Sequence, residues 1–377
     1  MTDTRTICSR CVSDTTIPKI RFDGNGVCNF CKVNDKLARI FPTDRGRQQM
    51  LDDLVANIKA TGRKKKYDCI IGVSGGTDST YTLYSAKKLG LRPLAVHLNN
   101  TWDTEIATEN IRKAVEKLEV DFREIHCDWE EFRALQIAFL KASVTDAEIP
   151  TDIAIFGVLL RVAAEEGTRY VLNGHSFRTE GIAPIGWTYM DGRYIRSVYK
   201  QFTGEKLKHF PNVNLGSYLY YAFLKRIRMV PFLNYFDYSK ERAREVLERE
   251  LEWTYYGGHH FESAYTYFVI VHLLMKKFGV DKRKIGFSAK IRSGQMTRQE
   301  ALEQLKTPPP VPEGLTEQCI EKLGLSPEQF EAIMQAEPKA FSDYKTYYPL
   351  LQTARPFIKV ASMLRIISPV LYQKFFS

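Results

Sequence analysis

The stretch "IIGVSGGTDST", residues 70–80, decides the fold of this chain and directs the search for its function. An apolar run stops there at Ser74, and two glycines, a threonine, an aspartate and a second serine follow. A glycine-rich turn between a strand and a helix presents backbone N–H groups to an anion, and the helix dipole strengthens that attraction. The carboxylate of Asp78 would repel a phosphate, but it suits a Mg²⁺ ion that bridges phosphates. The pattern therefore predicts a phosphate-binding loop made of Ser74, Gly75, Gly76, Thr77, Asp78 and Ser79.

Strand and helix patterns alternate around this loop. The predicted strands are residues 67–73, 92–100, 121–128 and 168–174, and the predicted helices between them are 79–90, 104–120 and 153–167. This alternation predicts an α/β fold with a doubly wound parallel sheet. After about residue 200 the alternation stops, and helical patterns such as that of residues 238–253 take over.

In a parallel sheet of this kind, ligands bind beyond the carboxyl ends of the strands. We therefore expect a ligand site beyond the predicted strands, near the ends of residues 92–100 and 168–174.

Two Cys-x-x-Cys pairs, "CSRC" at 8–11 and "CNFC" at 28–31, lie near the start of the chain. Pairs with this spacing suit four thiolates around one tetrahedral zinc ion, and "FDGNGVC" between them offers the turn that a zinc ribbon needs. Four cysteines leave no open position for water, so the ion is expected to stabilise a segment too small to fold alone. The predicted zinc ligands are Cys8, Cys11, Cys28 and Cys31.

The loop "SGGTDS" lacks the lysine of a Walker motif and resembles the pyrophosphate-binding loop of the PP-loop ATP pyrophosphatases. That superfamily includes asparagine synthetases, GMP synthetases and tRNA-modifying enzymes. The resemblance implies that ATP, with Mg²⁺, is cleaved between its α and β phosphates and that AMP passes to an oxygen of the substrate. It also implies that the second predicted strand lines the adenine site through backbone groups near His97 and that Asn173 and Gly174 lie near the ribose or phosphates. The resemblance further implies that Glu180 shares the Mg²⁺ ion with Asp78. The predicted units are a zinc ribbon at 1–35, a helical linker at 36–66, a PP-loop domain at 67–200 and a helical substrate or partner region at 201–377.

Several further segments narrow the resemblance. The ribbon, "TDIAIFG", "LNGHSFRTEG", "KFGVDKRK" and "IRSGQMTRQEAL" are together similar to the N-acetyl sugar amidotransferases of bacterial surface-polysaccharide (O-antigen) and nonulosonic acid synthesis. This resemblance runs from about Cys8 to Leu302 and implies that an acetamido group on a nucleotide-activated sugar becomes an acetamidino group. Because negative charge develops on phosphate oxygens in such a reaction, we expect cationic side chains nearby. The candidate catalytic residues are Asp78, Lys290 and Arg292, and the candidate substrate-binding residues are His259, His260, Lys282 and Arg283.

Ammonia for such a reaction needs a source. The chain has neither a cysteine at position 2 nor a Gly-x-Cys-x-Gly nucleophile turn, so we expect no glutaminase activity of its own. The family resemblance implies a separate glutaminase subunit and a cyclase-like barrel subunit that pass ammonia to this chain.

A thiolating PP-loop enzyme that modifies tRNA is the main alternative. The formal net charge of +10 suits an anionic partner but does not choose between nucleotides, RNA and an acidic subunit. Only Cys69, Cys127 and Cys319 remain to carry sulfur, and they are far apart in sequence, so we favour the sugar substrate and expect no nucleic acid. A non-catalytic zinc-ribbon binding protein is a third possibility, against which the intact loop argues.

Two stretches of the sequence bear on targeting and on contact with a membrane. "MTDTRTICSR" has no apolar signal-peptide core, which predicts a cytoplasmic protein. The most apolar late stretch, residues 357–376, is interrupted by Lys359, Arg365 and Pro369. We therefore expect a packing helix or a partner surface there and no membrane span.

Overall fold

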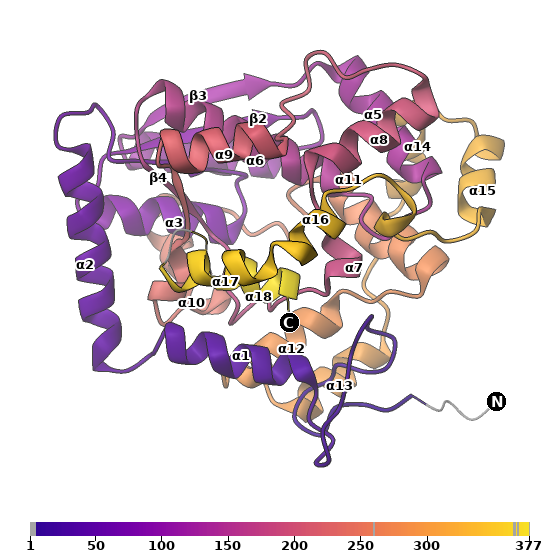
Figure 1. Cartoon of the computed structure of the whole chain (residues 1–377), viewed down its shortest axis with the longest axis horizontal. Coiled ribbons are helices and arrows are strands. Elements are labelled where there is room, and N and C mark those ends of the chain that lie inside the picture. The colour runs from indigo at the N-terminus through magenta and orange to yellow at the C-terminus, as the bar shows by residue number, and fades with distance from the viewer. Residues whose placement is uncertain (1–4, 259–260, 365–366, 368, 377) are drawn as a thin grey trace.

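The protein is built on one parallel sheet, seen in the computed structural model of Figure 1, which describes residues 5–258, 261–364, 367 and 369–376. Five strands lie in the order β3-β2-β1-β4-β5, and every neighbouring pair is parallel. The strands are β1 (Cys69–Gly72), β2 (Pro93–Asn99), β3 (Asp121–His126), β4 (Tyr170–Asn173) and β5 (Arg228–Pro231). This arrangement confirms the predicted parallel α/β fold.

Both faces of the sheet are buried, because successive side chains along a strand point to opposite sides. In β1, Ile70 joins one apolar core and Ile71 joins the other. Val171 and Leu172 of β4 divide between the same two cores. The sheet is therefore covered by helices on each face, as a doubly wound fold requires.

The helices before β5 cover the sheet and form the N-terminal part. They are α1 (Asn29–Ile40), α2 (Arg45–Gly62), α3 (Thr77–Lys88), α4 (Glu105–Lys117), α5 (Trp129–Lys141), α6 (Ile149–Glu165), α7 (Ile185–Thr188), α8 (Gly192–Thr203), α9 (Leu215–Leu219) and the π-helical turn η1 (Tyr220–Leu224). α6 packs on one face of β1, β2 and β4, and α3 packs on the other face of the same strands.

The helices after β5 wrap around the carboxyl end of the sheet. They are η2 (Phe232–Tyr235), α10 (Lys240–Leu251), α11 (Ala264–Phe268), η3 (Val269–Lys277), α12 (Arg283–Arg292), α13 (Arg298–Lys306), α14 (Leu315–Leu323), α15 (Pro327–Gln335), η4 (Phe341–Asp343), α16 (Tyr348–Thr353), α17 (Arg355–Met363) and α18 (Pro369–Phe376). Among the described residues, no helix combines the length and apolar character needed to cross a membrane.

Two elements cross the unit boundaries expected from the sequence. α1 begins at Asn29, directly after a zinc-ligand candidate, so it runs through the expected division at 35. β5 lies beyond residue 200, yet it pairs with β4 and completes the sheet. Its four residues end in a proline and carry too little pattern to be seen as a strand.

The central strands place the phosphate-loop candidate at the point where the chain order of the sheet reverses. β1 lies between β2 and β4, so the chain leaves β1 in one direction and reaches β4 in the other. The crevice between such strands is the usual ligand site of open α/β sheets. The sequence "SGGTDS" begins directly beyond β1 and leads into α3.

Candidate functional site

The loop at residues 74–79 is fixed by its glycines. Gly75 has a φ of +72°, and a β-carbon there would lie 2.2 Å from the backbone oxygen of Ala107. Only glycine satisfies both constraints without moving α4. The Gly75 carbonyl accepts a hydrogen bond from the Trp253 indole N–H at 2.9 Å, which ties the loop to the segment after α10.

Hydroxyl groups partner the loop amides that a phosphate would use. The Ser74 N–H donates to Ser79 Oγ at 3.1 Å, and the Gly76 N–H donates to Ser74 Oγ at 3.4 Å. The Thr77 N–H donates to the Tyr256 hydroxyl at 3.2 Å. Hydroxyl oxygens thus accept hydrogen bonds from amides of the loop and of the first residue of α3. The helix dipole favours an anion at this position.

Asp78 and Glu180 lie together around a lysine. Lys240 Nζ is 2.7 Å from Asp78 Oδ2 and 3.7 Å from Glu180 Oε1. The Tyr238 hydroxyl also donates to Asp78, and His175 Nδ1 lies 2.6 Å from Glu180 Oε2. Burial raises the pKa of Asp78 to about 6, with Glu180 adding to the effect and Lys240 opposing it. Burial would lower the pKa of Lys240, but the two carboxylates outweigh it and raise that pKa above its usual value.

The same carboxylates are chemically suited to Mg²⁺. A Mg²⁺ ion takes oxygen ligands and is commonly held by one or two carboxylates together with substrate phosphates. Asp78 and Glu180 supply such oxygens beside the loop, and their common contact with Lys240 shows that a single cation reaches both. The residues therefore fit the expected ion, which would screen charge on ATP phosphates.

The remaining nucleotide candidates lie at the strand ends. His97 is buried, with Nδ1 2.8 Å from the Val73 oxygen and Nε2 3.2 Å from Asp103 Oδ2. Both ring nitrogens are thus engaged, which leaves backbone groups as its means of contacting a nucleotide. Asn173 ends β4, and a β-carbon on Gly174 would lie 2.7 Å from the Asp78 backbone. The β4 loop therefore packs directly on the start of α3.

A cavity of about 1460 Å³ opens beside this cluster. Thr77, Asn173, Glu180 and Lys240 are among the residues that line it. Residues 281–283, 285–287 and the proline-rich residues 307–310 line it as well. The volume exceeds the 300–1,000 Å³ range typical of small-molecule sites, so it has room for more than one reactant.

The C-terminal candidates divide by environment. Lys282 lines the cavity, and burial lowers its pKa although Asp152, Glu148 and Asp146 attract its charge. Lys290 also lines the cavity and pairs with Glu241 at 2.8 Å. His259 and His260 lie outside the described residues.

The contacts of Arg283 join neighbouring segments of the protein. Its guanidinium pairs with Asp281 at 2.7 Å, and its Nη1 donates to the backbone oxygens of Thr307 at 2.7 Å and Gln304 at 3.2 Å. The side chain therefore holds the proline-rich segment against α12. Substrate binding through this guanidinium would require breaking those contacts.

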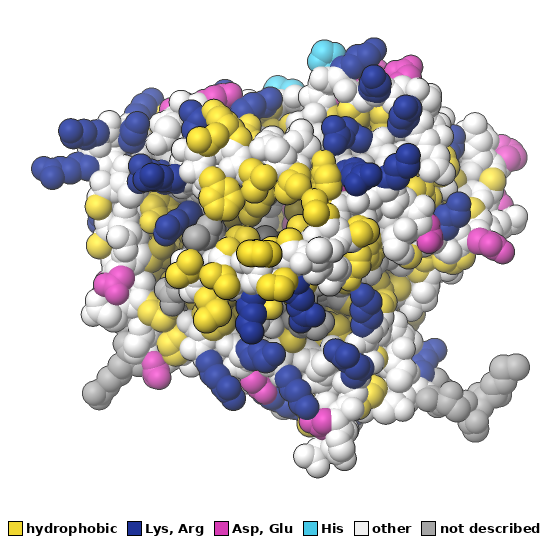
Figure 2. All heavy atoms as spheres, in the orientation of Figure 1, with side chains coloured by type: hydrophobic (Ala, Val, Ile, Leu, Met, Phe, Trp, Pro, Cys, Tyr) yellow, Lys and Arg dark blue, Asp and Glu magenta, His cyan; other side chains and the backbone are white. Residues whose placement is uncertain are grey.

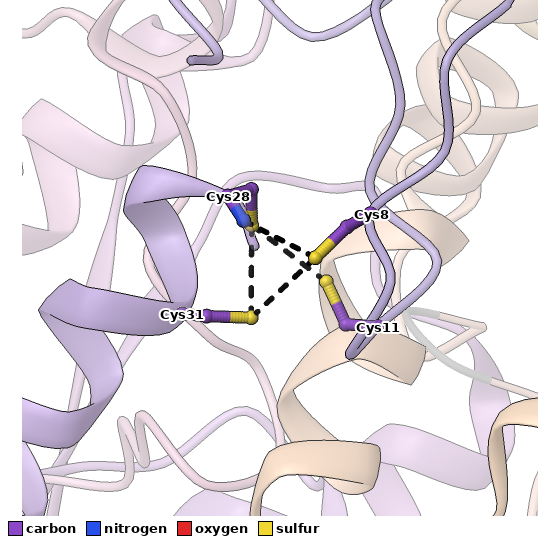
Figure 3. Close-up of side chains that lie close together, drawn as sticks. All are labelled: Cys8, Cys11, Cys28 and Cys31. Carbon is purple, nitrogen blue, oxygen red and sulfur yellow. Dashed lines mark hydrogen bonds between the residues drawn. The ribbon is translucent and has the colours of Figure 1, made fainter. Parts of the chain in front are cut away.

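The four N-terminal cysteines converge, as Figure 3 shows. All are fully buried, and their sulfurs lie 3.9 Å apart for Cys8 and Cys31, 3.8 Å for Cys11 and Cys28, and 3.6 Å for Cys28 and Cys31. A tetrahedral zinc site with bonds of about 2.3 Å places its sulfurs about 3.8 Å apart. The four thiols therefore fit one zinc ion, which would supply folding energy to the ribbon.

Arg292 lies on this cysteine cluster and not on the phosphate loop. Its Nε is 3.2 Å from Cys31 Sγ, and its Nη2 is 3.2 Å from Cys11 Sγ. Four thiolates on Zn²⁺ leave an excess of negative charge, which the guanidinium offsets. The expected role at the reacting phosphates is thus corrected, because α12 packs against α1 and carries Arg292 to the ribbon.

The sequence does not single out Lys240 and Tyr238, although both side chains contact Asp78. Residues 238–253 read as a solvated, charged helix, and Lys240 stands in its first turn. Ser239 caps that helix by accepting from the Arg242 N–H, which sets the direction of α10 toward Asp78. The signal available was a lysine directly after a helix N-cap, and that signal is too common to single out a site.

Residues 262–356 match the family model described as LPS biosynthesis protein WbpG-like, C-terminal domain. This match confirms the expected resemblance to a surface-polysaccharide family. It extends past Leu302, the expected limit of that resemblance. It covers a quarter of the chain and describes the segment that carries Lys282, Arg283 and Lys290. No curated protein matches the chain.

Solved structures that are similar to this chain include three proteins of low sequence identity. NMN synthetase from Francisella tularensis has a TM-score of 0.34 and 16% identity, over 75% of this chain and 98% of that one. The U34-tRNA thiolase NcsA from Methanococcus maripaludis with its [4Fe-4S] cluster has 0.32 and 15%, over 77% and 89%. A predicted subunit of tRNA methyltransferase from Methanocaldococcus jannaschii has 0.29 and 15%, over 58% and 91%. Because these TM-scores are low, the assignment of the fold depends on the observed strand order and not on these likenesses.

Proposed function

We propose that this chain is an ATP-dependent amidotransferase that converts the N-acetyl group of a nucleotide-activated sugar into an acetamidino group, in lipopolysaccharide O-antigen or related glycan synthesis. The observation that carries the proposal is the cavity. Residues of the phosphate-loop cluster and residues of the LPS-family segment line the same cavity. ATP and a bulky sugar nucleotide would meet between them.

The loop end supplies the groups that ATP needs. Amides at the start of α3 would hold the departing pyrophosphate. Asp78 and Glu180 would hold Mg²⁺, and Lys240 would move from these carboxylates toward phosphate oxygens as negative charge develops there. The lysine starts 2.7 Å from Asp78, so a short side-chain movement is sufficient.

The chemistry follows from the weakness of an acetamido group as an electrophile. Its carbonyl oxygen attacks the α-phosphorus of ATP, and the bond to pyrophosphate breaks. The resulting O-adenylyl imidate has AMP as a good leaving group. Ammonia then attacks the carbon, AMP departs with the oxygen, and a C–N bond replaces the C–O bond with loss of a proton.

Among the described residues, we assign the removal of that proton to Lys282. It lines the cavity, and burial lowers its pKa, so a neutral amine is more accessible to it than to a surface lysine. Glu148 is one of the carboxylates that attract the charge of Lys282, and burial raises the pKa of Glu148 to about 7. General acid–base catalysis favours a pKa of this kind, close to the working pH.

Ammonia would be delivered by a separate glutaminase subunit through a cyclase-like barrel subunit. This partner proposal rests on the resemblance of the sequence to the N-acetyl sugar amidotransferases. Ammonium ion at high concentration should replace both partners in the test tube, because the acceptor chemistry lies within this chain.

The alternative, thiolation of tRNA, requires cysteines at the reacting centre. Cys69 is buried in β1, and burial raises the pKa values of Cys127 and Cys319 to about 12. None of these cysteines is among the described residues that line the cavity. The sulfurs of the N-terminal cluster lie at spacings that suit one ion, and they are closer than the ligands of a four-iron cluster would be. These observations favour the sugar substrate.

The deciding experiment measures AMP and pyrophosphate release from ATP by the purified chain with ammonium chloride. A UDP-linked diacetamido sugar and bulk tRNA with a sulfur donor would be offered separately. Sugar-dependent pyrophosphate, with a product in which NH replaces O by mass, is expected. Stimulation by tRNA alone would replace the proposal with the thiolation alternative. Lys240→Met serves as the control for release that does not depend on this site.

A further inference from the structure

Two segments of the chain carry basic residues and no acidic ones, and their charge is as large as the net charge of the whole chain. Residues 206–236 and 344–377 contain no aspartate or glutamate, and together they hold ten Lys and Arg residues. That number equals the formal net charge of +10, so the rest of the chain has as many acidic as basic side chains. The ten are Lys206, Lys208, Lys225, Arg226, Arg228, Lys345, Arg355, Lys359, Arg365 and Lys374.

The same two segments carry the most exposed large apolar side chains. In α17, Phe357 is 80% exposed, Val360 55% and Met363 74%. Their spacing of three residues places them along one side of the helix. In η1, Phe223 is 53% exposed and Leu224 76%. Exposing side chains of this kind is costly in water, so a repeated set of them marks a contact surface.

The exposed helices of these two segments lie on one face of the molecule. α9, α17 and α18 all face the viewer in Figure 1, and in Figure 2 the apolar side chains gather around a hollow on that face. Lys and Arg side chains stand above and below them, and acidic side chains lie mainly toward the edges. Tyr221 after α9 and Val370 in α18 both line the main cavity, so this apolar and basic surface surrounds its mouth.

We propose that this face, formed by α9, η1 and α17, binds the surface of an anionic lipid bilayer. The apolar side chains would enter the boundary between headgroups and acyl chains, and the basic residues would contact the lipid phosphates. Lys359 lies between Phe357 and Val360, and Lys225 and Arg226 directly follow Leu224, so each apolar group has cations beside it. The cavity mouth would then open at the membrane surface.

Charge favours a lipid surface over a protein partner. A protein interface of this size normally presents charges of both signs to fix its register. Here every formal charge in both segments is positive, which matches a surface of uniform negative charge. The apolar residues also protrude from short helices, whereas buried cores of protein interfaces need broad complementary packing.

The test is flotation of the purified full chain with lipid vesicles. Vesicles of phosphatidylcholine alone would be compared with vesicles that also contain phosphatidylglycerol, at low and high salt. Binding is expected only with the anionic lipid and should weaken with salt. Phe357→Ser combined with Met363→Ser should weaken partitioning about tenfold or more, since two large apolar groups are lost. Arg226→Gln and Lys359→Gln should each weaken it about fivefold.

Ile106→Ser with Phe122→Ser provides the matched control, because both side chains are 41% exposed and lie outside the two segments. This variant should bind as the unaltered chain does. Absence of binding to anionic vesicles would overturn the proposal and leave an acidic protein as the occupant. Equal binding to both vesicle types, or an equal loss in the control, would also overturn it. None of these results bears on sugar-dependent pyrophosphate release, which is measured without lipid.

Discussion

Two lysines line the same cavity, and their surroundings act on the positive charge in opposite ways. Lys240 is 17% exposed and lies 2.7 Å from Asp78, whose carboxylate helps to raise the lysine pKa. Lys282 is also near carboxylates, those of Asp152, Glu148 and Asp146, yet burial lowers its pKa. One lysine is therefore held charged, whereas the other is shifted toward the neutral amine.

The difference shows how one cavity can serve two chemical tasks. Stabilising phosphate charge requires a cation that does not give up its proton. Moving a proton requires a group whose two forms are both accessible near neutral pH. Direct contact with a carboxylate favours the charged lysine, and burial without a sufficient compensating interaction favours the neutral one. Two lysines of one cavity thus differ in how firmly they hold their charge although their residue types are alike.

The largest effect is expected from Lys240→Met. Removing the ammonium leaves Asp78 and Glu180 facing each other, and breaking a buried ion pair of this type costs about 3 kcal/mol. ATP cleavage should fall by about 10²–10³-fold, the loss usual for one electrostatic stabiliser. Thermal unfolding and pyrophosphate release would measure the two effects. Lys240→Arg keeps the charge and should retain most of the stability. Full activity in the methionine variant would contradict the role given to this lysine.

Lys282→Met tests the other lysine. Because burial already disfavours the charged amine, an apolar side chain of similar length should change stability by no more than about 1 kcal/mol. The ammonia-dependent step should slow by about 10²-fold, as loss of a general base does. Pyrophosphate release and product formation, followed separately in one reaction, would distinguish the first half of the reaction from the second. A large loss of stability would instead place Lys282 with Lys240 as a charged structural group.

Glu148, a carboxylate that attracts the charge of Lys282, gives a prediction about how stability depends on pH. Burial raises its pKa from 4.5 to about 7, so the folded protein binds this proton more tightly than the unfolded chain. The contribution to stability is therefore greatest at low pH and declines as pH rises from about 4.5 through about 7. Between pH 5 and pH 7.5 the decline should be about 2 kcal/mol. Denaturant unfolding of Glu148→Gln across this range should be flatter by that amount, and an unchanged slope would contradict the assignment.

The predictability of these groups follows their distance in sequence. The cysteine pairs and "SGGTDS" are short patterns whose spacing encodes their geometry, so the convergence of the four cysteines and the strand-to-helix position of the loop follow from sequence. Lys240 reaches Asp78 from 162 residues away, through a helix whose pattern gives no sign of that contact. The expected closeness of Asp78 and Glu180 came from the family resemblance, and the structure brings both to Lys240. Nothing local distinguishes Lys240 from the many other lysines that begin or flank helices.

Arg292 shows the same limit, because its position depends on how α12 packs and not on its own sequence neighbours. Its cation faces thiols, so it adds a third environment to the comparison of Lys240 with Lys282. Ser288 in the same helix lies 3.0 Å from Ser13 of the ribbon, which places α12 directly on the cysteine cluster. Sequence alone placed the cationic residues of α12 together at the phosphates, whereas the helix divides them between cavity and ribbon.

The smallest expected effect is that of Arg292→Gln on zinc. The guanidinium contacts three of the four sulfurs and offsets their negative charge, so its loss should weaken zinc binding about tenfold. Competition with a chromophoric chelator would measure the change. Arg298→Gln is the matched control, because Arg298 also contacts the ribbon but donates to the backbone oxygens of Cys8 and Cys11. If both variants weaken zinc binding equally, Arg292 acts through docking of the ribbon. If only Arg292→Gln does so, charge on the sulfurs is the cause, and this buried cation belongs with Lys240 as one held charged by its anions.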